Sequence, residues 1–371
     1  MSTVDFAIPK GSTVLVTGAS GLVGSHVADQ FLQFGYKVRG TARNTKKSAW
    51  LSEVFDKKYG TGQFELLSIP DMAADDACTD AVKGVSVVTH VASVMTFDPD
   101  PNKVIPTVIA GAVNVLKAAF AESSVKRFVY TSSSTAALLP KPNVSGIVVT
   151  EDTWNDEAVK LAWSSTSYSA EQANLTYAAS KTQAEQEVWK FYKENKDRRP
   201  DFVVNSEVVP DCNFGKSLDV VNQGHPSTSG FLVFLWQNQN VEILKQFDPR
   251  HFVDVQDTAI LHVAAAVHPD IKGERIFAFA EPFNWDKVLD ILRKQNPSVK
   301  FIDNFQSDQD LSEIKPKDRA EQLLRDLGRP GWTSLEDGIL MNTEDLRQGG
   351  VGWSPMAGNL AMSLDAIKGA N

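Results

Sequence analysis

A tyrosine and a lysine four residues apart are the side chains in this sequence best suited to proton transfer. Tyr177 and Lys181 bound the segment Tyr-Ala-Ala-Ser-Lys, and on a helix this spacing places both on one face. A nearby cation favours the phenolate and lowers the pKa of a phenol toward the range useful for acid catalysis. The pair could protonate a carbonyl oxygen while hydride reaches its carbon. The alternative is an ordinary surface pair.

Tyr192 and Lys196 repeat the same spacing, so their position must separate the two pairs. Ligands of open parallel sheets bind beyond the carboxyl ends of the strands, an edge that only one end of an antiparallel helix can reach. The composition predicts a helix over 177–195, which places Tyr177 at that end. Tyr192 lies about 22 Å further along at the helical rise. Tyr177 and Lys181 are therefore the candidates.

A run of hydroxyl side chains, Thr131 to Thr135, follows a predicted strand over 127–131. A hydroxyl at the carboxyl edge of a sheet could donate to a substrate oxygen and align the phenol. Clusters of Ser and Thr also serve as plain loop caps, and both interpretations stay open here.

A glycine-rich turn lies between the first predicted strand and the first predicted helix. Its sequence is Thr-Gly-Ala-Ser-Gly-Leu-Val-Gly over 17–24. Without side chains, such a turn lets a pyrophosphate approach backbone N–H groups at a helix N-terminus. The position after a strand and before a helix favours dinucleotide binding over a purely structural turn.

The residues after the second predicted strand indicate which dinucleotide is bound. An NAD site usually has an Asp or Glu about 20 residues after the glycine turn, but no acid occurs from 31 to 52. The stretch instead carries Lys37, Arg39, Arg43, Lys46 and Lys47. Arg43 and Lys47 fall just beyond the strand, where an arginine can hold a 2′-phosphate. This pattern favours NADP(H) over NAD(H), the alternative being a solvated basic edge.

The elements that must position these groups alternate between strand and helix. Predicted strands cover 14–16, 37–41, 64–68, 85–91, 127–131 and 202–209, and predicted helices cover 22–34, 103–122 and 177–195. This alternation predicts a Rossmann-type α/β fold with a doubly wound parallel sheet. We expect a nucleotide-binding domain over 1–215, to which 252–281 returns. A smaller mixed α/β substrate lobe would comprise 216–251 and 282–371, with a tail after 356.

Length, composition and charge narrow the class of protein. The chain has 371 residues, 42% hydrophobic and 22% charged, with 37 basic against 46 acidic residues and a net charge of -9. This balance argues against a nucleic-acid partner. We expect no membrane span, since no stretch approaches 18 continuous apolar residues. Two cysteines, Cys78 and Cys212, and scattered histidines have no metal spacing, so we expect no metal and a reducing, cytoplasmic setting.

The glycine turn, the Thr-Ser-Ser-Ser strand end and the Tyr-Ala-Ala-Ser-Lys segment together resemble the extended short-chain dehydrogenase/reductases. The likeness is strongest to the dihydroflavonol-reductase-like branch and its microbial NADPH-dependent carbonyl (aldehyde/ketone) reductases. It is supported by the segments 35–43, 90–93, 125–129, 252–259 and 327–332.

The resemblance implies roles for individual residues. Tyr177 would be the general acid, Lys181 would lower its pKa and bind the nicotinamide ribose, and Ser133 would be the catalytic serine. The implied cofactor-binding residues are Gly18, Ser20, Gly21, Leu22, Val23, Gly24, Arg43, Lys47, Asp71, Met72, Ala92, Ser93, Tyr177, Lys181 and Pro210. Phe97 and Phe231 are expected to line the substrate pocket.

The resemblance implies an NADPH-dependent reductase whose substrate is a small-molecule aldehyde or ketone, and we expect a monomer or homodimer. Two alternatives stay open. One is an NAD-dependent sugar-nucleotide epimerase or dehydratase, and the other is a regulator that senses NADP without turnover. His90 is expected to be a structural histidine, and Asp254 and Asp257 to open a helix through 266. Residues 154–176 are polar and serine-rich and predict a loop.

Overall fold

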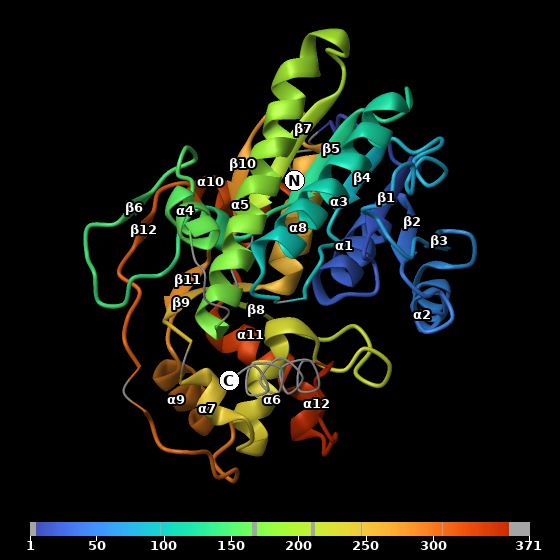
Figure 1. The fold of residues 1–371 in the computed structure, drawn as a ribbon. Helices are drawn as coiled ribbons and strands as arrows, with labels where there is room; N and C mark the ends of the chain where they lie inside the picture. Colours follow the sequence, from blue (N-terminus) through green and yellow to red (C-terminus); the bar gives the residue numbers. More distant parts are fainter. Residues whose placement is uncertain are drawn as a thin grey trace.

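The computed structural model describes residues 5–96, 98–164, 169–208, 212–245, 247–305 and 307–355. It consists of a large parallel sheet with helices on both faces and a smaller mixed α/β part below it (Figure 1). This is the Rossmann-type α/β fold that the alternation of strands and helices predicts.

Seven parallel strands form the large sheet of the described residues, in the order β10-β7-β5-β4-β1-β2-β3. They are β1 (Thr13–Thr17), β2 (Lys37–Ala42), β3 (Phe64–Ser68), β4 (Val87–His90), β5 (Arg127–Thr131), β7 (Val203–Val208) and β10 (Arg275–Phe277). The first six match the strands predicted from the sequence to within two residues at each end. The strand order reverses between β1 and β4, where a crevice for a ligand is expected at the carboxyl ends.

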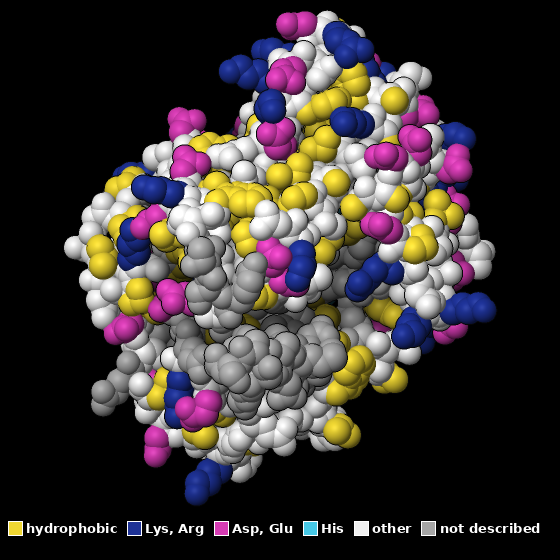
Figure 2. All heavy atoms as spheres, in the orientation of Figure 1, with side chains coloured by type: hydrophobic (Ala, Val, Ile, Leu, Met, Phe, Trp, Pro, Cys, Tyr) yellow, Lys and Arg dark blue, Asp and Glu magenta, His cyan; other side chains and the backbone are white. Residues whose placement is uncertain are grey.

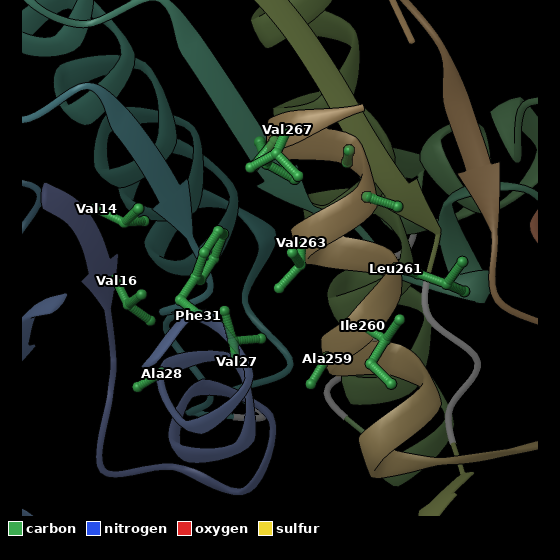
Figure 3. Close-up of a cluster of buried hydrophobic side chains, with 14 of the residues drawn as sticks. Val14, Val16, Val27, Ala28, Phe31, Ala259, Ile260, Leu261, Val263 and Val267 are labelled. Atoms are coloured by element: carbon green, nitrogen blue, oxygen red, sulfur yellow. The ribbon is translucent and has the colours of Figure 1, made fainter. Parts of the chain in front are cut away.

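Helices cover both faces of this sheet. One face carries α1 (Leu22–Gln33), α2 (Trp50–Tyr59), α8 (Val255–Val267) and α10 (Lys317–Asp326), and the other carries α3 (Pro101–Ala121) and α5 (Ala170–Asn195). Figure 3 shows Val27 and Phe31 of α1 between Val16 of β1 and Val263 of α8, all four fully buried. This core fixes the helix that follows the glycine turn to the sheet.

The helix that carries Tyr177 begins seven residues earlier than the sequence predicts. The Ser169 side chain caps α5 by accepting from Gln172 N at 3.1 Å, and a side-chain cap of this kind starts a helix without any apolar periodicity. Tyr177 therefore lies two turns inside α5. The expected loop over 154–176 is also wrong, because Asn155 accepts from Ala158 N and opens α4 (Asp156–Ser164).

The smaller part contains a three-stranded sheet in the order β11-β9-β8. Its elements are β8 (Cys212–Phe214), β9 (Arg250–Asp254), β11 (Glu281–Phe283), α6 (Gly230–Gln237), α7 (Val241–Leu244), α9 (Trp285–Gln295), α11 (Leu335–Asn342) and α12 (Glu344–Arg347). A further pair, β6 (Val148–Val149) and β12 (Glu313–Ile314), and 3-10 turns at Ser134–Ala136 (η1), Lys196–Arg198 (η2) and Ser227–Ser229 (η3) complete the fold. The core of the smaller part is rich in aromatic residues, with six Phe and one Trp among its buried side chains.

Strand pairing does not follow the expected domain boundaries everywhere. β8 precedes residue 215 but pairs with β9 in the smaller sheet, because Cys212 and Phe214 are buried in its aromatic core. Within 252–281, β10 is a strand of the large sheet and α8 packs on it, whereas the end of β9 belongs to the smaller sheet. α10, beyond 282, packs on α8 and β10 through Leu323 and Leu324.

Within the described residues, α3 is the one helix long and apolar enough to cross a membrane by length and composition. It starts at Pro101, two residues earlier than predicted, because Asp100 caps it by accepting from Asn102 N at 3.0 Å. Val108, Val115 and other residues of one side are buried on the sheet. In this fold α3 is a core helix packed beside α5 (Figure 1).

Candidate active site

Lys181 lies buried beside the carboxyl end of β5, one turn after Tyr177 on α5. Its Nζ donates to the Thr131 carbonyl oxygen at 2.9 Å and sits 5.0 Å from the centre of the Tyr130 ring. Burial lowers the pKa of Lys181 to about 8, against the charge of Glu185, which raises it. A buried ammonium is thus held where it can act on a neighbouring phenol.

Tyr177 lies half-buried on the same side of α5 as Lys181. Burial, with the nearby groups Glu185 and Tyr177, raises the pKa of Tyr130, which therefore stays a neutral phenol. The structure thus brings Tyr130, Tyr177 and Lys181 together beside the end of β5, where the sequence places the candidate pair.

Ser133 is buried directly after β5 and caps the short turn η1. Its Oγ accepts from Thr135 N at 3.3 Å and from Thr135 Oγ1 at 3.0 Å. These contacts use its lone pairs and leave its own O–H without an acceptor among the described residues. Ser133 is therefore both a cap and a hydroxyl with a proton to donate.

Glu185 is a second buried charge on α5, beside Lys181. Glu185, one turn after Lys181, accepts from Ser132 Oγ and Ser206 Oγ, both at 2.6 Å, and from Arg275 Nε at 2.9 Å. Although burial opposes it, the Arg275 charge and these hydrogen bonds lower the pKa of Glu185. The carboxylate stays ionised and favours the charged form of Lys181.

Thr131 is also held from the opposite face of the sheet. Its Oγ1 lies 2.7 Å from His262 Nε2 on α8, and His262 Nδ1 lies 2.5 Å from Glu207 Oε2 on β7. All of His262 and Glu207 is buried, and burial raises the pKa of Glu207. Two buried glutamates, Glu185 and Glu207, therefore flank the strand end that precedes Ser133.

His90 ends β4 as a structural residue. The Thr17 hydroxyl accepts from Val91 N at 3.0 Å and Ala92 N at 3.1 Å, so its hydrogen goes to His90 Nδ1 at 2.9 Å. His90 then carries its proton on Nε2. Burial, with the charge of Lys181, lowers the pKa of His90 to about 3. The neutral ring ties the ends of β1 and β4 together.

The glycine turn fits the pyrophosphate of a dinucleotide. A Cβ on Gly24 would lie 2.2 Å from the Gly18 carbonyl oxygen, and Gly18 has φ +66° and a Cβ there would lie 2.9 Å from Ala92. Gly21 is the N-cap of α1 and has no side chain to fill the turn. The first N–H groups of α1, from Leu22 onward, have no partner within the helix and suit a phosphate.

Two exposed cations follow the end of β2. Arg39, within β2, already has partners in the fold: it pairs with Glu65 and donates to the Ala81 carbonyl oxygen at 2.8 Å. The side chains of Arg43 and Lys47 are exposed and have no ion-pair or hydrogen-bond partner among the described residues. Figure 2 shows Lys and Arg side chains at the right of the molecule, where Figure 1 places β2, β3 and α2. A 2′-phosphate would neutralise them.

The remaining predicted cofactor residues lie at the ends of neighbouring strands. Asp71 is exposed and accepts from Ala73 N at 2.9 Å, while Met72 packs half-buried against the α3 side of the core. Ala92 and Ser93 follow β4, and Ser93 Oγ is buried without a hydrogen-bond partner among the described residues. Their contacts with a cofactor remain predictions, as do those of Ser20 and Val23 in the turn.

Of the two predicted substrate residues, the structure describes Phe231. Phe97 lies outside the described residues, and so does Pro210, which the resemblance implies as a cofactor-binding residue. Phe231 is 1% exposed, and its ring packs 4.9 Å from Phe247 and 5.7 Å from Trp285. In this structure Phe231 is part of the aromatic core, and its contact with substrate stays a prediction.

Sequence reasoning missed the second layer of the site, Glu185, Arg275, Glu207 and His262. A signal for one of them was present, since Glu185 continues the four-residue spacing of Tyr177 and Lys181. Among the described residues no group of three or more His, Cys, Asp or Glu could hold a metal ion.

Comparison with known proteins agrees with this geometry. Residues 14–278 match the NAD dependent epimerase/dehydratase family. The chain is 42% identical over 341 residues to aldehyde reductase 2 of Sporidiobolus salmonicolor, covering 91% of this chain and 97% of the relative. It is 35% identical over 338 residues to the ketoreductase nvfG of Aspergillus novofumigatus, covering 90% and 96%.

A solved structure shows the same fold. The yeast methylglyoxal/isovaleraldehyde reductase Gre2 complexed with NADPH superposes with a TM-score of 0.76 at 23% identity, over 91% of this chain and 98% of that one. The chain belongs to the NAD dependent epimerase/dehydratase family, the extended short-chain dehydrogenase/reductases. The resemblance stated from the motifs is thereby confirmed.

Proposed function

We propose that the protein is an NADPH-dependent carbonyl reductase that converts an aldehyde or ketone to an alcohol. The observation that carries this proposal is Lys181, buried and cationic beside Tyr177 at the end of β5. The relatives named aldehyde reductase and ketoreductase support the reaction class.

Each residue of the set has a separate task. When bound, the reduced nicotinamide supplies the hydride. Tyr177 gives its phenolic proton to the substrate oxygen, and the charge of Lys181 favours the resulting phenolate. Ser133, whose O–H has no acceptor among the described residues, donates to the same oxygen and orients it.

The proposed cofactor is NADP(H). The glycine turn offers backbone N–H groups to the pyrophosphate, and Arg43 and Lys47 offer unpaired charge to the 2′-phosphate. Gre2, a structural neighbour, is complexed with NADPH. An NAD-specific site would instead have an acid after β2.

A substrate panel tests the reaction. Purified protein is mixed with NADPH and small aldehydes and ketones, and loss of the reduced-nicotinamide absorbance is followed with product analysis. We expect consumption of NADPH with one equivalent of alcohol formed. An epimerase would convert a sugar nucleotide without net NADPH consumption, and a sensor would bind NADPH without turnover on any carbonyl.

We propose further that the protein works in the cytoplasm, as a monomer or homodimer, without nucleic-acid or membrane partners. Its two cysteines, Cys78 and Cys212, are buried and form no disulfide among the described residues, as suits a reducing compartment. Size-exclusion chromatography with light scattering measures the oligomeric state, and fractionation of the source cells measures the location.

A further inference from the structure

Gln223 lies buried in the loop that follows β8, yet it contacts the glycine turn about 200 residues earlier in the chain. Its Nε2 donates to Ser25 Oγ at 2.9 Å and lies 3.2 Å from the Gly21 carbonyl oxygen and 3.3 Å from the Ser20 carbonyl oxygen. Each of these acceptors belongs to the turn or to the first residues of α1. The Gln223 amide nitrogen therefore contacts both the glycine turn and the first turn of α1.

The other end of the same amide is anchored in its own loop. Gln223 Oε1 accepts from Ser217 Oγ at 3.0 Å and from Leu218 N at 3.1 Å. Both ends of the side chain are thus hydrogen-bonded, which fixes the orientation of the amide. Because every polar atom of this buried group has a partner, Gln223 joins two segments without an unsatisfied donor or acceptor.

The contact helps to orient one peptide group of the turn, whose Gly21 carbonyl oxygen accepts both from Gln223 Nε2 at 3.2 Å and from Ser25 N of α1 at 2.9 Å. A peptide is planar and trans, so its N–H points opposite to its C=O. The Gly21 carbonyl faces Gln223, and the N–H in the same plane, that of Leu22, therefore points away from Gln223. Leu22 N–H is among the first groups of α1 and has no partner within the helix. Holding the Gly21 carbonyl toward Gln223 therefore directs the Leu22 N–H to the opposite side of the turn.

A second contact and the C-terminal segment keep the loop in place. His26 Nε2 lies 2.7 Å from the Lys216 carbonyl oxygen. Trp353 Nε1 donates to the Val220 carbonyl oxygen at 3.1 Å, and the Trp353 ring leaves no room for a Cβ at Gly224. In Figure 1 this loop, drawn in yellow, lies between α1 and α12.

We propose that Gln223 is a positioning residue for dinucleotide binding, which holds the N–H groups of the glycine turn toward the pyrophosphate. The proposal rests on the proposed function for the presence of a dinucleotide. It adds a segment from beyond the Rossmann βαβ unit to the cofactor site. Because NADPH and NADH share the pyrophosphate, Gln223 contributes equally to both and nothing to the choice between them.

Two variants separate hydrogen bonding from packing. Gln223→Met keeps the size of the side chain and removes every hydrogen bond. Gln223→Glu keeps the acceptor for Ser217 and Leu218 but places an oxygen against the two carbonyls. Gln295→Met is the matched control, because Gln295 Nε2 donates to the Glu336 carbonyl oxygen at 2.8 Å between α9 and α11, outside the glycine turn.

Dissociation constants are measured by calorimetry for NADPH, NADH and adenosine 2′-monophosphate, which lacks the pyrophosphate. We expect both Gln223 variants to bind NADPH and NADH about tenfold more weakly, by the same factor, as for one or two lost hydrogen bonds. Binding of adenosine 2′-monophosphate should be unchanged, and Gln295→Met should match the wild type. Melting temperatures confirm that each variant is folded.

Three results would overturn the proposal. They are wild-type affinity for NADPH in both Gln223 variants, an equal loss of adenosine 2′-monophosphate binding, or a loss confined to NADPH. If the wild-type protein bound neither dinucleotide, the proposed function itself would be rejected and this proposal with it. A wild type that binds both dinucleotides beside unchanged Gln223 variants would reject the Gln223 proposal alone.

Discussion

Replacing Glu185 by Gln should shift the pH dependence of turnover, because Glu185 is the charge that supports the Lys181 cation. At about 6 Å, the spacing of side chains four residues apart on a helix, and an effective dielectric constant of about 20, the attraction is about 3 kcal/mol, or about two pKa units. Arg275 offsets part of this charge. We therefore expect the pKa of Lys181 to fall from about 8 by one to two units.

The direction of the shift in the pH profile follows because Lys181 supports turnover in its cationic form. Wild-type kcat/KM should decline as the pH rises through about 8, and the decline should begin one to two pH units lower in Glu185→Gln. Glu187→Gln is the control, because Glu187 lies on the same helix but is solvent-accessible and pairs with Lys190. The assay is the pH profile of kcat/KM at fixed ionic strength, with urea unfolding in parallel. An unmoved decline in Glu185→Gln, or an equal shift in Glu187→Gln, would refute the reasoning.

Three further substitutions test other parts of the site. Arg43→Ala should weaken NADPH binding about 10- to 100-fold while leaving NADH nearly unchanged, as for a lost charged hydrogen bond to phosphate; equal losses in calorimetry would contradict the 2′-phosphate assignment. Lys181→Met should abolish turnover but raise the free energy of unfolding at pH 7 by about 1–3 kcal/mol, because a cation with its pKa lowered to about 8 destabilises the fold below that pH. The wild type should accordingly gain stability as the pH rises from about 8 toward 10.5, and a flat urea-unfolding profile there would speak against it. Gly24→Ala should lose NADPH binding, since its Cβ would meet the Gly18 carbonyl at 2.2 Å; an unchanged dissociation constant would show that the turn can relax.

Local patterns were sufficient for six of the seven strands of the large sheet and for the position of Tyr177 and Lys181 beside the end of β5. Strands such as Phe64–Ser68 and Arg127–Thr131 are short apolar runs with clear ends, and the structure reproduces them. The Tyr177 and Lys181 pair needs only helical spacing and the rule that ligands bind at carboxyl strand ends. The start of α5 was missed because a Ser169 cap, not hydrophobic periodicity, begins the helix.

Contacts between distant segments could not be predicted from the sequence alone. Arg275 meets Glu185 across 90 residues, and His262 meets Thr131 across 131 residues. Such pairs depend on which strands and helices become neighbours, and no local spacing encodes that. The same applies to Gln223, whose partners in the glycine turn lie about 200 residues away.

Two elements lie across the domain boundaries expected from the sequence, for a related physical reason. β8 and α10 are placed by the cores that they complete, the aromatic core of the smaller part and the aliphatic core beside α8. Both cores accept apolar residues from any position in the chain. A single boundary at residue 215 or 282 therefore cannot assign β8 and α10 to the cores in which they pack.

The most direct test of the account is the turnover of Tyr177→Phe on an aldehyde or ketone that the wild type reduces, at saturating NADPH. This substitution removes only the phenolic oxygen, so NADPH should bind with nearly wild-type affinity. We predict that kcat falls by about a thousandfold, the scale of a lost general acid. Full turnover by Tyr177→Phe with NADPH bound would contradict the claim that Tyr177 protonates the carbonyl oxygen.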